Sequence, residues 1–310
     1  ARILVLGSSG FIGTNLTNIL VSRNLKVSGT YFTNSPKFKN PSVDYFRLDA
    51  RNLEENRTLF QSYEYIFVCC AVTSGSNVIR NTPMVHFHDN NVMNTRILEA
   101  AASSGVKRIL FISSSTVYPN SELEMRETDV DGTYFPAYEI VATMKRYFEK
   151  AYEFYASKNF SAMETVVVRP SNCFGIYDDF AWETSKVIPA LIRKFVEKHD
   201  PIEVWGDGKD LKDFIYCEDL VIGLILAMFK GKSGDAYNIA SGSSTSILNL
   251  IDILIKVSDY SPRLNFKLNI PSMIPVRKIN IDKAKRELGF KPHVNFELGV
   301  EKTLKWYENL

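Results

Sequence analysis

The stretch Gly7-Ser8-Ser9-Gly10-Phe11-Ile12-Gly13 decides how the rest of the chain can be interpreted. It follows the apolar run Ile3-Leu4-Val5-Leu6, which is typical of a parallel strand buried on both faces. After it, apolar residues recur at helical spacing over Phe11–Arg23. Glycines in such a turn permit close approach of the backbone, and the free N–H groups of the first helical turn attract a diphosphate.

The spacing of the three glycines is G-x-x-G-x-x-G, and a glycine triplet by itself also fits a purely structural turn. Its location between the first strand and the first helix favours dinucleotide binding. The predicted cofactor-binding residues of this turn are Gly7, Gly10, Phe11, Ile12 and Gly13.

The composition is that of a globular protein of enzyme size, with 310 residues, 45% hydrophobic content and a net charge of +2. This balanced charge predicts no nucleic-acid partner. The longest apolar stretch, Leu220–Phe229, has about half of the ~20 residues that a membrane span needs, so no membrane insertion is expected. No N-terminal signal sequence is expected, because the chain enters its first strand at once. The four cysteines lack metal-binding spacing, which favours free thiols in a cytoplasmic protein without a metal.

Strands and helices alternate as far as residue 172, which predicts an α/β fold with a doubly wound parallel sheet of the Rossmann type. Beyond this point the alternation loosens, which predicts a smaller C-terminal α/β lobe. We expect a dinucleotide-binding domain over residues 1–172 and a substrate lobe over residues 173–310, partly interleaved with the first. The predicted helices of the lobe are Glu183–Lys198, Leu220–Phe229, Ile247–Val257, Asp282–Leu288 and Glu297–Tyr307, and its predicted strands are Glu203–Trp205, Phe214–Tyr216 and Tyr237–Ile239.

The end of the second predicted strand, Leu25–Tyr31, bears on the choice between NAD and NADP. An acidic residue there would bind the ribose hydroxyl of NAD. Here the strand ends in Thr30-Tyr31-Phe32-Thr33, and the missing carboxylate, together with Lys37, slightly favours NADP, although Lys37 also fits an ordinary loop lysine. Asp49, at the end of the next strand, can accept a hydrogen bond from the adenine amine or cap a helix that begins near Leu53.

The run Ser113-Ser114-Ser115-Thr116 and Tyr138 lie where a substrate should meet the cofactor. The run follows the predicted strand Arg108–Ile112, and Tyr138 begins the long predicted helix Tyr138–Ser157. A tyrosine beside a nicotinamide can exchange a proton with a sugar hydroxyl while hydride moves at the same carbon, and a serine or threonine hydroxyl can position the reacting oxygen. Taken alone, the run also fits a strand-end turn, and Tyr138 also fits a partly buried aromatic residue.

Six ordered motifs extend over almost the whole chain: GSSGFIG at the start, NVMNT from Asn91, SSSTVY from Ser113, RPSNCFG from Arg169, GDGKDLKDFIYCEDL from Gly206 and KAKRELGFKP from Lys283. Through them the sequence resembles the extended short-chain dehydrogenases/reductases of the nucleotide-sugar epimerase/dehydratase family. The segment SKVIPALIRKF from Ser185, followed by EVWGDG, is most similar to the GDP-fucose synthase-like members.

This resemblance implies an NAD(P)-dependent enzyme that acts on a nucleotide-activated sugar. Ser114 would bind the reacting oxygen, and Tyr138 would be the catalytic acid/base. Asn172 would contact the diphosphate of the substrate. The diphosphate and the base would be surrounded by Trp205, Lys212 and Arg277. The residues that the resemblance places around the cofactor, besides the glycine turn and Asp49, are Ala71, Asn91, Ser113, Tyr138 and Pro170.

The chain departs from the family pattern at several positions. The family motif Tyr-x-x-x-Lys has a lysine four residues after the tyrosine, where this chain has Ala142. Lys145 lies three residues further on nearly the same helical face, and it either partly replaces the missing lysine or is a solvated surface lysine. In the GDP-fucose synthases a cysteine and a histidine carry the 3,5-epimerisation, and the matching residues here are Thr116 and Lys186. Because a threonine hydroxyl is a much weaker acid than a thiol, we predict no 3,5-epimerisation.

Thr116 is also without the neighbouring acidic pair of the 4,6-dehydratases, which disfavours dehydration. The remaining chemistry is hydride transfer at C4, as a dehydrogenase/reductase or a C4 epimerase, for surface polysaccharide synthesis. The alternative is a catalytically degenerate NAD(P)-binding sensor or scaffold of the same fold, which Ala142 favours. A reductase for a non-nucleotide carbonyl compound is disfavoured by the motifs of the second lobe.

The family usually forms homodimers through two long helices, here Asn91–Ser104 and Tyr138–Ser157. The second of these helices is rich in aromatic residues, which either form such an interface or pack in the core: Tyr147, Phe148, Tyr152 and Phe154. We expect a homodimer.

Overall fold

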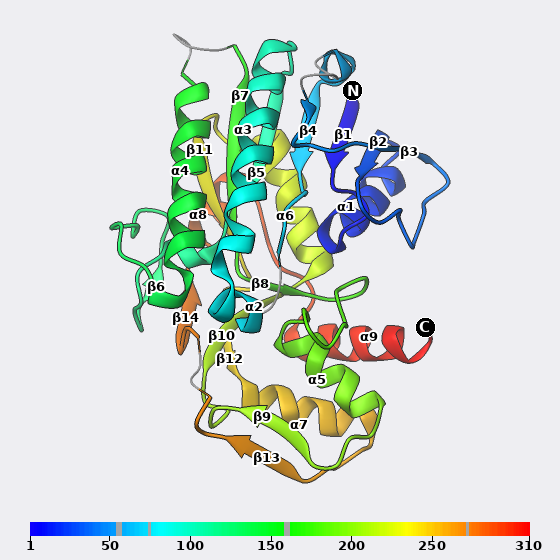
Figure 1. Cartoon of the computed structure of the whole chain (residues 1–310), viewed down its shortest axis with the longest axis vertical. Coiled ribbons are helices and arrows are strands. Elements are labelled where there is room, and N and C mark those ends of the chain that lie inside the picture. The colour runs from blue at the N-terminus through cyan, green and yellow to red at the C-terminus, as the bar shows by residue number, and fades with distance from the viewer. Residues whose placement is uncertain (54–57, 74–75, 158–161, 271–272) are drawn as a thin grey trace.

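The computed structural model describes residues 1–53, 58–73, 76–157, 162–270 and 273–310. Its centre is a seven-stranded sheet between layers of helices (Figure 1). In spatial order the strands are β11 (Asp235–Ile239), β7 (Glu164–Pro170), β5 (Arg108–Ile112), β4 (Tyr65–Val68), β1 (Arg2–Leu6), β2 (Lys26–Tyr31) and β3 (Val43–Arg47). All neighbouring strands are parallel. This arrangement confirms the predicted doubly wound fold.

Two hydrophobic cores cover the two faces of the large sheet. Ile3 and Val5 of β1 belong to one core, whereas Leu4 and Leu6 belong to the other. The apolar run of β1 is therefore continuous because both of its faces are buried. The helices that pack on the first face are α1 (Phe11–Ser22) and α6 (Cys217–Lys230), and those on the second face are α3 (His88–Ser103) and α4 (Glu139–Tyr155).

The order of the strands reverses between β1 and β4, which are hydrogen-bonded neighbours. From β1 the chain continues outward to β2 and β3, and from β4 it continues to the opposite edge. In open α/β sheets, ligands bind outside the carboxyl ends of the strands at the point where the strand order reverses. The glycine turn, which follows β1, lies at this point.

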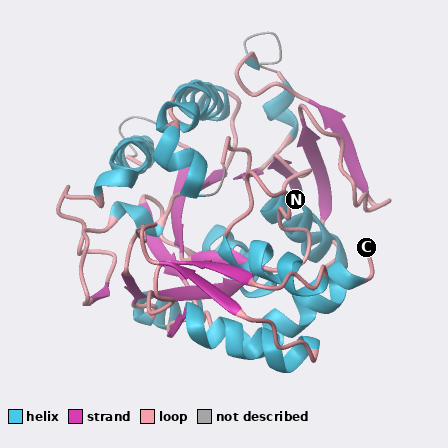
Figure 2. Ribbon diagram, turned by 60° about the horizontal axis from the view of Figure 1, so that its bottom comes forward, coloured by secondary structure: helices cyan, strands magenta, loops and turns pink. Residues whose placement is uncertain are grey.

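The second lobe lies below the sheet in Figure 1, and Figure 2 brings it forward. Its main sheet consists of β12 (Ser244–Ser246), β10 (Leu211–Tyr216), β14 (Val276–Ile279) and β6 (Glu124–Met125), and β8 (Asn172–Phe174) also pairs with β10. A separate pair is formed by β9 (Ile202–Trp205) and β13 (Leu264–Lys267). The helices of the chain not yet named are α2 (Ser76–Asn81), α5 (Val187–Val196), α7 (Ile247–Ser258), α8 (Asp282–Leu288) and α9 (Phe296–Glu308). No described helix is both long enough and apolar enough to span a membrane.

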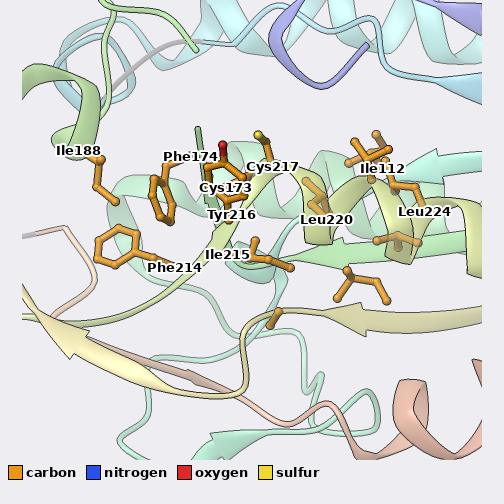
Figure 3. Close-up of a cluster of buried hydrophobic side chains, with 14 of the residues drawn as sticks. Ile112, Cys173, Phe174, Ile188, Phe214, Ile215, Tyr216, Cys217, Leu220 and Leu224 are labelled. Atoms are coloured by element: carbon orange, nitrogen blue, oxygen red, sulfur yellow. The ribbon is translucent and has the colours of Figure 1, made fainter. Parts of the chain in front are cut away.

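One of the two cores of the sheet continues into the lobe. Figure 3 shows part of it, from Ile112 at the end of β5 to Phe214 of β10 and Ile188 of α5. All three side chains are at least nine-tenths buried. Because one apolar core extends through both parts, the lobe is held firmly against the carboxyl edge of the sheet.

The structure corrects several predicted elements. Helix α5 begins at Val187 rather than at Glu183, and α6 begins at Cys217 rather than at Leu220. The predicted lobe strand Tyr237–Ile239 belongs to β11, which pairs with β7 in the large sheet. The short strands β6, β8, β12, β13 and β14 were not predicted, because their two to four residues are too few to show a clear pattern of apolar residues. The division of the chain at residue 172 stays a prediction.

Candidate functional site

Two of the three glycines of the turn have no room for a side chain, because a Cβ atom there would collide with the protein itself. Gly7 has a φ of +80°, and a Cβ atom built on it would lie 2.6 Å from the Cα atom of Cys70. A Cβ atom on Gly13 would lie 2.3 Å from the carbonyl oxygen of Gly7. Both distances are well below van der Waals contact, so neither position accepts a side chain.

Gly10 differs, because the protein leaves room for a side chain there. A Cβ atom on Gly10 would meet only the carbonyl oxygen of Gly7, at 3.5 Å. Gly10 is the N-cap of α1, and no side chain caps this helix. The free space and the uncapped N–H groups of Phe11, Ile12 and Gly13 fit a diphosphate that approaches the backbone closely.

Thr30 at the end of β2 holds the glycine turn in place. The N–H group of Gly7 donates to the Thr30 hydroxyl at 3.0 Å. The N–H and hydroxyl groups of Ser8 both donate to the Thr30 carbonyl oxygen, at 2.8 and 2.9 Å. The polar groups at this strand end are therefore engaged inside the protein.

Asp49 binds Arg51, two residues further along the chain. Its carboxylate accepts hydrogen bonds from the backbone N–H group of Arg51 at 3.0 Å and from the guanidinium at 2.9 Å. The side-chain hydrogen bond from Arg51 lowers the pKa of Asp49. The helix predicted near Leu53 falls largely on residues 54–57, outside the described residues. A contact of Asp49 with adenine stays a prediction.

The loop after β4 is held by Asn90, a residue that the sequence analysis missed. Its amide accepts a hydrogen bond from the N–H group of Val72 and donates one to the carbonyl oxygen of Val72, both at 2.9 Å. The predicted Asn91 instead donates to the carbonyl group four residues earlier, and the predicted Ala71 is exposed. Asn90 shares a helix face with the buried Asn94, and this spacing could have indicated that Asn90 points inward.

The serine run after β5 divides into an inward part and an outward part. The buried Ser113 donates to the carboxylate of Glu149 at 2.5 Å, and Glu149 is paired with the buried Arg169 at 2.8 Å. Ser114 is partly exposed, and its hydroxyl oxygen accepts hydrogen bonds from the N–H and hydroxyl groups of Thr116, at 3.1 and 3.0 Å. Because Ser114 accepts twice, its own O–H group remains available to donate to a ligand oxygen.

Lys145 reaches the carboxyl edge of the large sheet. Its Nζ atom donates to the carbonyl oxygen of Ile112 at 2.8 Å and lies 4.8 Å from the ring centre of Phe111. Burial lowers the pKa of Lys145 to about 8. Ala142, at the position of the family's lysine, is fully buried in the protein. Lys145 is thus not a solvated surface lysine, and its amine lies beside the strand end that carries Ser113 and Ser114.

Tyr138 is partly exposed and lies at the N-cap of α4, seven residues before Lys145. Seven residues are about two helical turns, so both side chains lie on nearly the same face of α4. Tyr138 and Lys145 thus stand at the start and in the middle of one helix, and Lys145 reaches the end of β5.

The predicted diphosphate residues Lys212 and Arg277 are neighbours in the sheet of the lobe. Arg277 is 2% exposed and donates to the carbonyl oxygen of Pro119 at 2.9 Å. Its Nε atom has no partner among the described residues, and burial lowers its pKa to about 10. Lys212 lies 3.2 Å from Asp210, and burial lowers its pKa too. A buried arginine beside a partly buried lysine fits a charged ligand group such as a diphosphate.

The other predicted lobe residues are more exposed. Trp205 of β9 is 45% exposed, and its ring N–H group donates to Glu203 at 3.2 Å. Lys186 precedes α5, and its Nζ atom lies 5.2 Å from the ring centre of Phe11 at the start of α1. This contact brings a predicted substrate residue against a predicted cofactor residue. Pro170, at the end of β7, pairs in register with Ile239 of β11.

Asn172 is held by Asp213, another residue that sequence analysis missed. The exposed Asn172 donates its amide N–H to the carbonyl oxygen of Asp213 at 3.0 Å. The buried carboxylate of Asp213 accepts four hydrogen bonds, from the hydroxyl of Ser171, the N–H and hydroxyl groups of Ser241 and the N–H group of Gly242. Burial raises the pKa of Asp213. Asp213 therefore joins β10 to the loops that follow β7 and β11.

No group of three or more His, Cys, Asp or Glu side chains that could hold a metal ion occurs within the described ranges. Comparison with known proteins shows the family of the chain. The model of the NAD dependent epimerase/dehydratase family matches residues 3–240. The chain belongs to this family.

The similar proteins align with this chain over almost its whole length. A GDP-L-fucose synthase from Sinorhizobium fredii (strain NBRC 101917 / NGR234) is 27% identical over 97% of this chain and 94% of its own. A dTDP-4-dehydro-6-deoxy-D-allose reductase from Streptomyces sp is 26% identical over 98% and 95%. The solved UDP-glucose 4-epimerase with UDP-glucose from Thermotoga maritima has a TM-score of 0.87 at 23% identity, covering 100% of this chain and 99% of that one. This structural similarity confirms the fold.

Membership of the family makes a nicotinamide dinucleotide the cofactor of this epimerase/dehydratase, in agreement with the room beside Gly10. The residues of the glycine turn would hold its diphosphate. The role of each remaining residue stays a prediction.

Asp213 supports a prediction about the substrate lobe. In an Asp213→Asn variant, the amide must turn an N–H group toward one of four donors, which leaves a buried N–H group unpaired and should shift the backbone carbonyl of residue 213 that holds Asn172. We expect the dissociation constant of the nucleotide sugar to rise about tenfold, while that of NAD(P) stays within about twofold. Calorimetric titration of both ligands measures this difference. Asp207→Asn, at an exposed site of the same lobe, is the control. Equal weakening of both ligands would show a general loss of structure instead.

Proposed function

We propose that this epimerase/dehydratase transfers hydride at C4 of a nucleotide-activated sugar, as a dehydrogenase/reductase or a C4 epimerase. The observation that carries the proposal is the arrangement at the end of β5, where the amine of Lys145 donates to the carbonyl oxygen of Ile112 and the partly exposed hydroxyls of Ser114 and Thr116 follow within four residues. A hydroxyl donor and a nearby cation suit a carbon centre whose oxygen gains or loses a proton as hydride moves. Surface polysaccharide synthesis is the proposed context.

In this proposal each residue has one task. The nicotinamide dinucleotide, when bound, supplies or accepts the hydride. Ser114 donates its free O–H group to the reacting sugar oxygen and thereby orients it. Tyr138 exchanges the proton with this oxygen, and Lys145 supplies a positive charge on the same helix. Because the family's lysine is replaced here by the buried Ala142, Lys145 is the lysine of α4 that we assign to this role.

On the substrate side, Lys212 and Arg277 neutralise the diphosphate, and Asn172 binds it. Trp205 offers an exposed indole to the base. GDP-linked sugars are the first candidates, because a GDP-L-fucose synthase is among the similar proteins. The cysteine and the histidine that carry 3,5-epimerisation in the GDP-fucose synthases are replaced here by Thr116 and Lys186, so 3,5-epimerisation is not part of the proposal.

The proposal is tested by incubating the protein with GDP-, UDP-, dTDP- and CDP-hexoses and with both dinucleotides. The absorbance of the reduced nicotinamide follows net oxidation or reduction, and NMR identifies an epimer that forms without a net redox change. A product altered only at C4 supports the proposal. A 4-keto-6-deoxy product would refute it, because that product requires dehydration.

The second candidate is an NAD(P)-binding sensor or scaffold without turnover. Ala142 in place of the family's lysine is the observation that favours it. The Tyr138 variant described in the Discussion separates the two candidates.

We also propose a cytoplasmic homodimer. All four cysteines are free, which fits a reducing compartment. Of the aromatic residues of α4, Phe148 and Tyr152 are buried in the core, whereas Tyr147 and Phe154 are 60% and 59% exposed. Val92 of α3 is 45% exposed, and α3 packs against α4. Exposed apolar side chains on two adjacent helices support pairing with a second copy.

A Tyr147→Glu variant is expected to shift the protein from dimer to monomer, because it places a charge on this apolar face. Light scattering after size-exclusion chromatography measures the mass. Lys150→Glu, on the same helix and already in an exposed ion pair, is the control and should leave the mass unchanged. A monomer in the unmodified protein would contradict the proposed dimer.

A further inference from the structure

The aromatic ring of Phe32, directly after β2, lies close to two arginines. The guanidinium carbon of Arg47 lies 5.3 Å from the ring centre of Phe32, and that of Arg51 lies 5.1 Å from it. The Nε atom of Arg47 also donates to the carbonyl oxygen of Phe32 at 3.2 Å. We call these three residues the β2-end cluster.

The location of the β2-end cluster relates it to the cofactor. Thr30 binds the N–H group of Gly7 at 3.0 Å, and Phe32 follows only two residues later. In a dinucleotide fold, the residues at this strand end face the adenosine ribose. A carboxylate there recognises the free 2′-hydroxyl, whereas an arginine nearby accommodates a 2′-phosphate. The chain has no carboxylate between Thr30 and Arg47 except Asp44, which lies near the start of β3, at the other end of the strand from Arg47.

The two arginines differ in what they already bind. Arg51 is paired with Asp49 at 2.9 Å and with Asp89 at 3.1 Å. Arg47 is exposed and forms no ion pair with any described carboxylate, although its charge contributes to the lowered pKa of Asp49. The outer N–H groups of Arg47 are therefore open to a ligand while its Nε atom fixes the direction of the side chain. A guanidinium held in this way suits the bidentate binding of a phosphate.

Lys37, the cation that the sequence suggested for this purpose, is less well placed. The next residue, Phe38, packs against Tyr177 and against Trp306 of α9, with ring centres 4.7 and 5.7 Å apart. These contacts anchor this part of the loop to the lobe rather than to the end of β2.

We infer that the β2-end cluster binds the 2′-phosphate of NADP, and that Arg47 is the residue that makes the protein prefer NADP to NAD. Arg51, fixed by two carboxylates, also contacts the ring of Phe32 and keeps the cluster in position. The inference depends on dinucleotide binding by the family, and not on the proposed chemistry at C4.

The test is the dissociation constant of each cofactor, measured by calorimetry without any sugar nucleotide. The unmodified protein should bind NADP about ten- to a hundredfold more tightly than NAD, and Arg47→Ala should remove this difference by weakening NADP alone. Adenosine 2′,5′-bisphosphate should lose affinity in parallel, whereas AMP should not. Added salt should weaken NADP more than NAD, because the extra contact is ionic.

Two controls keep the result interpretable. Lys37→Ala should leave both dissociation constants within about twofold. Arg47→Lys should retain part of the preference for NADP, because lysine keeps the positive charge but cannot form the two parallel hydrogen bonds of a guanidinium. Tighter binding of NAD than of NADP by the unmodified protein would overturn the inference. A preference for NADP that survives Arg47→Ala would also overturn it. The same holds if Arg47→Ala weakens the binding of inorganic phosphate but leaves the preference for NADP unchanged. Failure of the C4 chemistry would leave these measurements untouched.

Discussion

Turnover of a nucleotide sugar falls by roughly 10²- to 10⁴-fold when Tyr138 is replaced by Phe, while NAD(P) binds as before. This result is expected because the substitution removes the phenol that exchanges the proton and keeps the aromatic ring at the start of α4. Single-turnover kinetics with the preferred sugar measures the loss, and fluorescence titration measures the affinity for the cofactor.

Tyr147→Phe is the matched control, because it removes the same hydroxyl from an exposed position on the same helix. It should leave turnover unchanged. Full activity of the Tyr138→Phe variant would exclude Tyr138 as the acid/base. A protein that binds NAD(P) but processes no nucleotide sugar, with or without Tyr138, would favour the sensor instead.

Lys145→Met is expected to lower kcat/KM by about ten- to a hundredfold. The pKa of the Lys145 amine is about 8, so the unmodified enzyme should lose activity as the pH rises through about 8 and the amine loses its charge. Lys145→Arg should remove this decline, because its guanidinium stays charged. The pH profiles of the three proteins provide the measurement.

The same group also affects stability. The pKa of Lys145 is lowered from 10.5 to about 8 on folding, so between these values the unfolded chain binds more protons than the folded one. The free energy of unfolding should therefore gain a rising contribution from Lys145 as the pH increases from about 8 to about 10.5. Lys145→Met should lose this contribution. An unchanged slope in chemical denaturation would show that the amine is not buried as described.

An Ala142→Lys variant tests whether a lysine at the family's usual position can take the role proposed for Lys145. Because Ala142 is fully buried, a lysine there has to displace core side chains, and we expect a lower melting temperature without any gain in turnover. Higher activity of Ala142→Lys, combined with normal activity of Lys145→Met, would return the role to position 142.

The large sheet could be predicted because its strands carry their own signal. Runs such as Ile3-Leu4-Val5-Leu6 are apolar throughout, since both faces of a parallel strand are buried, and the glycine turn marks where the first helix begins. The strand pair β6 and β14 shows no such signal, because both strands are short and join Glu124 and Lys278, two charged residues far apart in sequence. Pairing of this kind is decided by tertiary packing.

The residues of the site were predictable only in part. Ser114 and Thr116 follow from their position at a strand end, but whether Lys145 lies in solvent or at the sheet edge depends on its bond to Ile112, which no local pattern reveals. The roles of Asn90 and Asp213 depend on hydrogen bonds to backbone groups in other loops. Arg47 escaped notice because it lies on β3, and only the pairing of the two strands brings it beside Tyr31 at the end of β2.

Because the chain returns to the large sheet through β11, few positions are suitable for dividing this protein into fragments. A fragment that stops at Pro170 would leave β7 as a bare outer strand, with hydrogen-bonding groups and apolar side chains that β11 normally covers. Such a piece would be prone to self-association, so neither half is suited to separate expression. Crystallisation trials, fusions and split reporters should keep the stretch from Arg2 to Ile239 unbroken.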